Sequence, residues 1–211
     1  MQLIRSFNLL LFCLLLGCSH GENDALKNGD IIFQNSQSSQ CQAIQLATGS
    51  EYSHVGIVYI KEGKPYVYEA VQPVKMTPLK QWVNRGKGKH YVVKRLKDET
   101  VLTDEVLQKM SSEGKKFLGK NYDALFGWSD ERIYCSELVW KIYKRGAGID
   151  VGEIRKMKEY NFDHPIVKAE AEKRYGKSIP MEEDIVAPSD IFDAKNLKTI
   201  YEGSRVNAKY K

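Results

Sequence analysis

The sequence predicts an α+β fold in which a small antiparallel sheet packs on helices. An apolar run at residues 55–60 is separated by the turn 61–64 from a second run at 65–71, a pattern typical of a β-hairpin. Apolar residues recur at helical spacing over 103–118 and 136–143, which predicts two amphipathic helices. With 211 residues, 42% of them hydrophobic, the chain can bury the core of one globular domain.

Turn and cap residues delimit the other elements. The apolar run 31–34 follows an Asn-Gly turn and predicts a strand. Helical spacing over 38–48 directs Cys41 toward the core, with a serine at the cap, and Gly49 ends this helix. The sequence also predicts a short helix at 78–83, a strand at 91–96 and a last strand at 197–201. Regular structure is expected to resume at 187–192.

Two segments have no regular pattern. The loop 119–134 is rich in aromatic residues and either lines a cleft or packs as an ordinary loop. Residues 146–185 are rich in charge and glycine, with a helix-prone stretch near 166–175. We interpret them as an excursion over the core, to which the sequence assigns no role.

The N-terminus has the pattern of a lipoprotein signal. One arginine precedes an apolar run over 9–16, which is shorter than the roughly 20 residues of a membrane span. Residues 15–18 (Leu-Leu-Gly-Cys) resemble a bacterial lipobox, so we expect a signal peptide over 1–17, acylation of Cys18, a tether over 18–26 and one globular domain over 27–211. Ser19 favours the outer membrane, facing the periplasm, in a host with two membranes. A plain secretory signal or a buried N-terminal helix is the alternative.

The charged residues argue against a nucleic-acid partner. The formal net charge is +5, from 32 Lys+Arg and 27 Asp+Glu, and both signs intermix along the chain. No dense basic block is present, so we interpret these residues as a solvated surface. Nothing in the sequence calls for a cofactor.

A cysteine and a histidine carry the candidate chemistry. His54 begins an apolar β-type run, and Cys135 stands where an amphipathic helix begins. A thiol attacks as thiolate, and a helix N-terminus or an imidazolium lowers its pKa from about 8.5. His54 would serve as the base and later protonate the leaving group. The alternatives are a buried structural cysteine and a strand-edge histidine.

Hairpin geometry offers a third member. If the turn pairs Lys61 with Lys64, paired positions sum to about 125, so Gly56 faces Glu69, and His54 lies on the same side two residues away. Glu69 would then orient His54. A one-residue bulge would turn Glu69 to the other face and leave an exposed strand glutamate.

Attack of a thiolate on an acyl carbon would create an oxyanion, and preorganised hydrogen-bond donors must stabilise it. The backbone N–H of Cys135, at a helix start, is the natural donor. Tyr52, Ser53 and Tyr134 are the side-chain candidates for the oxyanion or the substrate.

Cys41 adds two further hypotheses. In an oxidising envelope Cys41 and Cys135 could form a disulfide, but we favour one buried thiol and one nucleophile. A metal site made of Cys41, Cys135 and His54 is disfavoured, because these residues lack the close spacing of common metal-binding pairs.

Four segments together resemble a known family. Residues 29–33 (GDIIF), 50–57 (SEYSHVGI), 68–70 (YEA) and 134–140 (YCSELVW) are similar to the YiiX/YaeF group of permuted papain-like amidases, part of the NlpC-type cysteine hydrolase superfamily. Residues 188–190 are a weaker match. The resemblance implies a circularly permuted papain-like fold, in which the histidine strand precedes the cysteine helix.

By position, the resemblance makes Cys135 the nucleophile, His54 the base and Glu69 the third polar member. It implies amide or ester hydrolysis, or acyl transfer, through a thioester, on a cell-wall peptide or a lipid. The expected protein is therefore a cysteine hydrolase anchored to the membrane of the bacterial cell envelope by the lipid on Cys18. Two rival interpretations remain. One is a lipid-anchored binding module that is catalytically silent, and the other is a thiol acyltransferase that acts on lipids.

Overall fold

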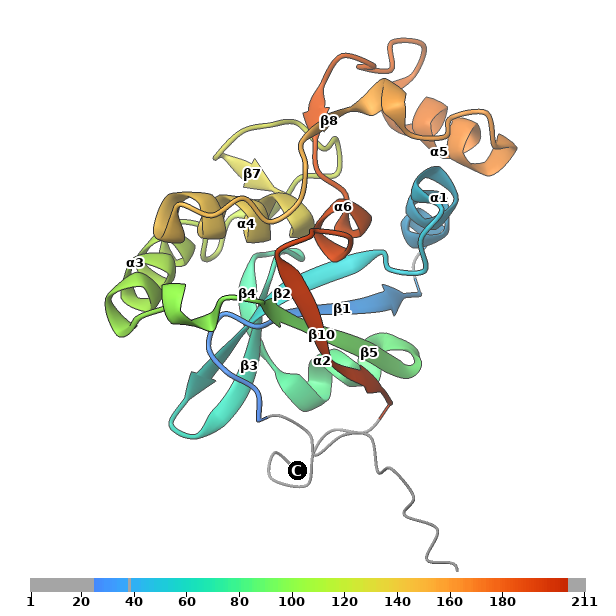
Figure 1. Cartoon of the computed structure of the whole chain (residues 1–211). Coiled ribbons are helices and arrows are strands. Elements are labelled where there is room, and N and C mark those ends of the chain that lie inside the picture. Colours follow the sequence, from blue (N-terminus) through green and yellow to red (C-terminus); the bar gives the residue numbers. More distant parts are fainter. Residues whose placement is uncertain (1–24, 38, 205–211) are drawn as a thin grey trace, which may run out of the picture.

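The computed structural model describes residues 25–37 and 39–204 and has an antiparallel six-stranded sheet at its centre (Figure 1). The strand order is β10-β5-β1-β2-β3-β4, and every neighbouring pair in this sheet is antiparallel. The strands are β1 (Ile31–Ser36), β2 (His54–Lys61), β3 (Lys64–Glu69), β4 (Lys75–Pro78), β5 (Gly86–Leu96) and β10 (Leu197–Gly203). This confirms the predicted α+β class.

Helices cover both faces of the sheet (Figure 1). The helices are α1 (Ser39–Thr48), α2 (Leu79–Arg85), α3 (Asp104–Lys115), α4 (Cys135–Ile142), α5 (Pro165–Tyr175) and α6 (Pro188–Phe192). Three short helical turns add η1 (Glu99–Val101), the π-helical η2 (Tyr143–Ala147) and η3 (Met157–Glu159). Helices α3, α4 and α6 pack on one face and α2 packs on the other.

Period-two alternation divides the sheet residues between two cores. Ile31 and Phe33 of β1 face the larger core with Leu138 of α4, whereas Ile32 faces the smaller core with Trp82 of α2. Both faces of the central strands are therefore buried. Because protein cores are closely packed, side chains at the sheet edge near α4 are held in fixed positions.

The hairpin β2–β3 has the predicted register. Lys61 pairs with Lys64, and Ile57 pairs with Tyr68, without a bulge. Glu69 therefore lies on the same face as His54.

The helices near α4 differ slightly from the predicted ranges. Thr103 caps α3, because its hydroxyl accepts the backbone N–H of Val106 at 3.3 Å, and the helix ends at Lys115. Helix α4 begins one residue earlier than predicted, at Cys135, and its last turn continues as η2.

The segment 146–185 forms a wall beside α1. It contains β8 (Arg155–Lys156), η3, α5 and β9 (Asp184–Ile185), and α5 packs against α1 (Figure 1). The backbone N–H of Asn161 donates to the carbonyl of Ala47 at 2.9 Å. The aromatic-rich loop adds the short parallel pair β6 (Asn121–Tyr122) and β7 (Arg132–Ile133).

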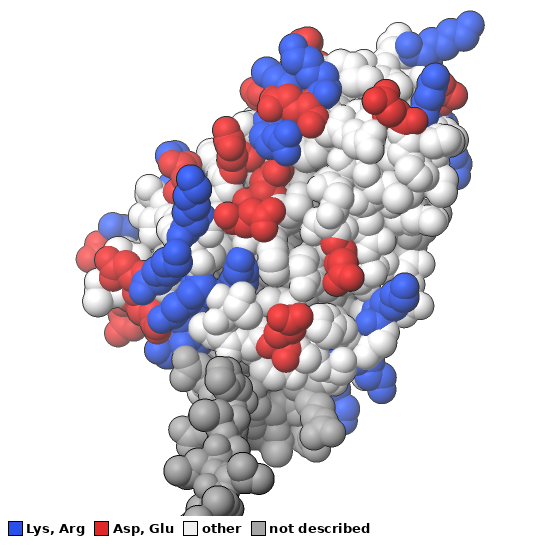
Figure 2. Space-filling view, turned by 45° about the vertical axis from the view of Figure 1, so that its right-hand side comes forward, with Lys and Arg blue, Asp and Glu red and all other residues white. Residues whose placement is uncertain are grey.

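The predicted signal peptide and Cys18 lie outside the described residues. Within the described ranges, no helix has the length and apolar character to cross a membrane. On the face in Figure 2, lysines and arginines lie beside aspartates and glutamates and form no extended block of one sign.

Candidate active site

Cys135 is the first residue of α4, and its side chain is buried. The first backbone N–H groups of a helix have no partner within the helix and carry partial positive charge. The sulfur therefore lies where backbone donors and the helix dipole favour negative charge.

His54 and Glu69 form a buried pair on neighbouring strands. The Nε2 atom of His54 lies 2.6 Å from Oε2 of Glu69. The other carboxylate oxygen accepts the hydroxyl of Thr77 at 2.6 Å and an N–H of Arg85. The indole of Trp82 stacks on the imidazole, with centroids 6.0 Å apart, and covers one face of it.

The imidazole also bonds Cys135, and both of its partners favour the charged ring. Burial alone would lower the pKa of His54, but the hydrogen bonds with Cys135 and Glu69 raise it to about 10. Because Glu69 occupies Nε2, Nδ1 is the nitrogen left for the thiol. An imidazolium beside a thiol favours the thiolate.

Glu69 stays ionised in spite of its burial. Burial alone would raise the pKa of Glu69, but hydrogen bonds from His54 and Thr77 and the charge of Arg85 lower it to about 2. The structure thus brings together the three residues that the sequence predicted, and Glu69 has the predicted orientation toward His54.

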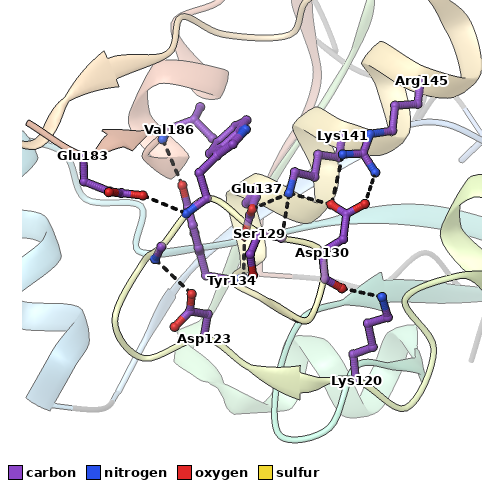
Figure 3. A network of polar contacts seen from close by, with 12 residues as sticks. Lys120, Asp123, Ser129, Asp130, Tyr134, Glu137, Lys141, Arg145, Glu183 and Val186 are labelled. Carbon is purple, nitrogen blue, oxygen red and sulfur yellow. Dashed lines mark hydrogen bonds and ion pairs between the residues drawn. The ribbon is translucent and has the colours of Figure 1, made fainter.

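An ionic network that is buried at Lys141 and Glu137 and exposed at Asp130 connects α4 to the loop before it (Figure 3). The ammonium of Lys141 lies 2.6 Å from Glu137 and 2.8 Å from Asp130, and it donates to the carbonyl of Ser129 at 2.6 Å. Asp130 also pairs with Arg145 at 2.6 Å. The network ties the aromatic-rich loop to the helix that carries the thiol.

Glu137 has a raised pKa within this network. Burial raises the pKa of Glu137 to about 7, although Lys141 acts in the opposite direction. Glu137 also accepts the backbone N–H of Tyr134 at 3.3 Å, which closes the first turn of α4.

Two side chains beside Cys135 hold the chain at Val186. The hydroxyl of Tyr134 accepts the backbone N–H of Val186 at 3.2 Å (Figure 3), and the hydroxyl of Ser136 donates to its carbonyl at 2.7 Å. These two bonds fix the segment before α6 against the thiol.

Two pockets meet at the cysteine–histidine pair. The first, which we name the apolar pocket, has a volume of about 100 Å³, contains Cys135 in its lining and lies between α1, α5 and residues 185–188. Its lining includes Ala43, Ala47, Phe126, Val167 and Ala171. The second, the polar pocket, has a volume of about 250 Å³ and contains His54. Phe126 confirms that the aromatic-rich loop lines a cleft.

The structure separates the three other side-chain candidates. Tyr134 lines the apolar pocket, and Ser53 lines the polar pocket while its hydroxyl accepts the backbone N–H of Ser36 at 3.1 Å. Tyr52 lines neither pocket, because its ring stacks on Phe192 with centroids 4.3 Å apart.

Sequence reasoning missed the tyrosine beside the thiol. Tyr122 lines the polar pocket, and its hydroxyl accepts an N–H of Gln40 at 3.0 Å. Burial raises the pKa of Tyr122 well above its usual value, and the nearby Cys135 adds to this effect. The only signal in the sequence was the aromatic character of the loop. The partners of Glu69 on β4 and α2, Thr77 and Arg85, were missed as well.

Both described cysteines are buried, and each is in the thiol state. The structure thus has no disulfide between Cys41 and Cys135. Among the described residues, no three His, Cys, Asp or Glu side chains cluster closely enough to hold a metal ion.

A thiol at a helix start, an imidazole on the adjacent sheet and a carboxylate behind it define a papain-like cysteine hydrolase whose histidine strand precedes its cysteine helix. The chain belongs to the YaeF/YiiX family of permuted papain-like amidase enzymes (C92), whose sequence model matches residues 25–201. The protein is thus a cysteine hydrolase of the amidase and peptidase type.

Relatives in Escherichia coli are similar over most of the chain. The uncharacterized protein YiiX of strain K12 is 52% identical over 174 residues, which are 82% of this chain and 85% of the relative. A crystal structure described as metalloprotein yiiX from strain O157:H7 is 51% identical, with a TM-score of 0.81, and covers 85% of this chain and 98% of its own.

Proposed function

We propose that this protein is a lipid-anchored envelope hydrolase that cleaves an amide or ester bond and holds the acyl part of its substrate in the apolar pocket. The observation that carries this proposal is the position of Cys135 in the lining of that pocket. A lipid or another acylated molecule suits this environment better than a polar cell-wall peptide.

The roles of the residues follow from their geometry. The thiolate of Cys135 attacks the acyl carbon, and the oxyanion is bound by the helix-start N–H groups, with the hydroxyl of Tyr122 nearby. His54 gives its proton to the leaving nitrogen or oxygen, the bond to the acyl carbon breaks, and a thioester remains. Water then attacks the thioester while His54 accepts its proton, and the carboxylic acid and free thiol are restored. Glu69 holds the imidazole in place.

The lining of the apolar pocket supports an acyl ligand. Its walls come from α1, α5 and the aromatic-rich loop, and its charged members Glu170 and Arg174 pair with each other at 3.3 Å. No charge is therefore left over to attract a polar substrate group among these lining residues. The segment 146–185 would thus give the enzyme its selectivity for the acyl part.

Trapping of the thioester tests this proposal. The full-length protein is incubated with p-nitrophenyl octanoate, and the acylated residue is mapped by mass spectrometry. We expect an octanoyl group on Cys135, and we expect Cys135→Ala to lower turnover by at least about 1,000-fold. Cys41→Ala removes the other described thiol, which lines the polar pocket, and the octanoyl group should still form on Cys135. Equal turnover by Cys135→Ala, or acylation at Cys41 alone, would contradict the proposal.

The proposed location rests on the lipobox-like residues 15–18, with Cys18 carrying the lipid. Ser19 supports the outer membrane facing the periplasm. Cys18→Ala should move the protein from the membrane fraction to the soluble fraction and remove bound acyl groups. A variant that stays acylated and in the membrane would rule out this anchor.

A further inference from the structure

We propose that the polar pocket binds a carboxylate on the leaving group of the substrate and that Arg85 is the residue that recognises it. This inference rests on the proposed function and names the second half of the substrate. The substrate class is then an acyl amide or ester whose amine or alcohol part carries a carboxylate.

The two pockets divide a bound substrate at the scissile bond. Cys135 lines the apolar pocket and His54 lines the polar pocket, and neither residue lines both. The thiolate bonds the acyl carbon, whereas the imidazolium protonates the leaving atom. The acyl part therefore lies on the side of Cys135, and the leaving group lies on the side of His54.

The charges of the polar pocket favour an anion. Its lining contains His54 and Arg85 and no aspartate or glutamate among the described residues. The nearby carboxylate of Glu69 lies behind His54 and already accepts three donors. An anion in the pocket thus meets two cationic groups, and the negative charges of Glu69 and of the Cys135 thiolate are already paired with these groups.

Arg85 has donors available for a ligand. One of its terminal nitrogens bonds Glu69, and no other acceptor bonds the guanidinium within the described part of the chain. Its side chain is 43% exposed, in contrast to the buried Glu69. A planar guanidinium matches a carboxylate with two parallel hydrogen bonds. Arg85 therefore faces both the catalytic carboxylate and the open pocket.

A buried amide in the same pocket also lacks a partner. The side chain of Gln34 is 1% exposed, and its Oε1 atom accepts no hydrogen bond from the described residues. This oxygen lies against Gly86, where a Cβ atom would come within 2.4 Å of it. An unpaired buried acceptor is costly, and the amide of Gln34 adds a polar group to the wall of the pocket.

The size of the polar pocket fits a small polar group. Its volume of about 250 Å³ is below the range of about 300–1,000 Å³ for drug-sized ligands. A carboxylate on a short linker fits this space.

Matched amides test the proposal. N-octanoylglycine and N-octanoylglycinamide share the acyl group and differ in the negative charge, and the full-length protein is assayed for octanoate release from each. We expect kcat/KM to be at least about 10-fold higher for N-octanoylglycine than for its amide. One charge-assisted hydrogen bond contributes free energy that corresponds to a factor of this size. In Arg85→Gln the ratio of the two values should fall to about 1. The ratio is the readout, because a defect in holding Glu69 lowers both values equally.

Lys80→Gln is the matched control, because it removes one exposed cation from the same helix without touching the pocket. It should keep the ratio of the wild-type protein. An octanoyl amide that ends in a phosphate is the third substrate, and a stronger preference for it would overturn the assignment of a carboxylate. Equal kcat/KM for the first two amides, or a preference that persists in Arg85→Gln, would overturn the role of Arg85.

Binding to Cys135→Ala separates this proposal from the proposed function. The same amides are titrated into this variant by calorimetry, with and without Arg85→Gln. Tighter binding of N-octanoylglycine that depends on Arg85, without turnover by the wild-type protein, would support the pocket and contradict the hydrolysis of such amides. Equal binding of both amides would contradict the pocket even if both are cleaved.

Discussion

Buried glutamates support both sides of the cysteine–histidine pair, and their surroundings give them opposite protonation behaviour. Glu69 on the side of His54 and Glu137 on the side of Cys135 are both fully buried. Glu69 accepts from three side chains, two of which carry positive charge, and its pKa falls to about 2. Glu137 has one cationic partner, Lys141, and burial raises its pKa to about 7.

The comparison shows that the number of charged donors, and not burial itself, decides whether a buried carboxylate stays ionised. Glu69 must stay negative to hold an imidazolium, so the three donors that keep its carboxylate ionised support the proposed reaction. Glu137 anchors a helix, which a neutral or a charged carboxyl group can do. We therefore expect the first glutamate to affect the reaction and the second to affect mainly the pH dependence of stability.

Between the two glutamates, removal of the charge of Glu69 is expected to have the larger effect on activity. Glu69→Gln should lower kcat/KM by about 100-fold, because the imidazolium loses its ionised partner. In the wild-type protein the raised pKa of His54 keeps the ring protonated until the pH rises through about 10, so activity should fall only there. The variant should shift this alkaline limit downward, as measured by a pH profile of kcat/KM.

Thr77→Val is the control for this prediction, because it removes one hydrogen bond to Glu69 and keeps its charge. It should lower activity by less than about 10-fold and leave the alkaline limit close to its wild-type position. An alkaline limit that stays at about pH 10 in Glu69→Gln would contradict the role given to the carboxylate.

The same charges predict a pH window for stability. His54 has a raised pKa, so its contribution is complete below about pH 6.5 and is lost as the pH rises through about 10. Glu69 has a lowered pKa, so its contribution is complete above about pH 4.5 and is lost as the pH falls toward 2. The stabilising contributions of His54 and Glu69 are therefore both complete between about pH 4.5 and pH 6.5.

The two sides also differ in how far the sequence could predict them. The relation of His54 to Glu69 follows from a tight hairpin, in which local pairing fixes the register and hence the face of each side chain. Arg85, Thr77 and Tyr122 reach the site through tertiary packing of other elements, which one sequence does not encode as a local pattern.

The segment 146–185 marks the limit of sequence reasoning. Its helix was predicted near 166–175 and is observed as α5, yet the apolar pocket that it forms with α1 depends on contacts between distant residues. The face of α5 that carries Val167 and Ala171 could be recognised as buried only after its partner was known.

Narrowing of the apolar pocket should have an intermediate effect. Ala171 is buried on α5 and lines this pocket, so Ala171→Phe would occupy space assigned to the acyl chain. We expect kcat/KM to fall about 10-fold for p-nitrophenyl octanoate and to change little for the acetate. Ala169→Phe adds the same group to the exposed face of the helix and should affect neither ester. An equal fall for both esters would show that the pocket does not hold the chain.

The smallest effect on activity is expected for Glu137. Its pKa is raised above the usual 4.5, so the folded state binds more protons than the unfolded state between about pH 4.5 and 7, and stability should decrease as the pH rises through this range. Glu137→Gln removes this titration, while Lys141 keeps its bond to Asp130. The variant should therefore show a flatter dependence of Tm on pH from 4.5 to 7, with kcat changed by less than about threefold.

Glu131→Gln makes the same change of charge at an exposed position of the neighbouring loop, and it should keep the wild-type slope. An unchanged slope in Glu137→Gln would mean that Glu137 is ionised in the folded protein. The contrast with Glu69 would then lie in function alone, because both carboxylates would carry charge across this range. A flattened slope confined to Glu137→Gln would instead mean that one cationic partner does not offset burial at this site, whereas the two cationic partners of Glu69 do.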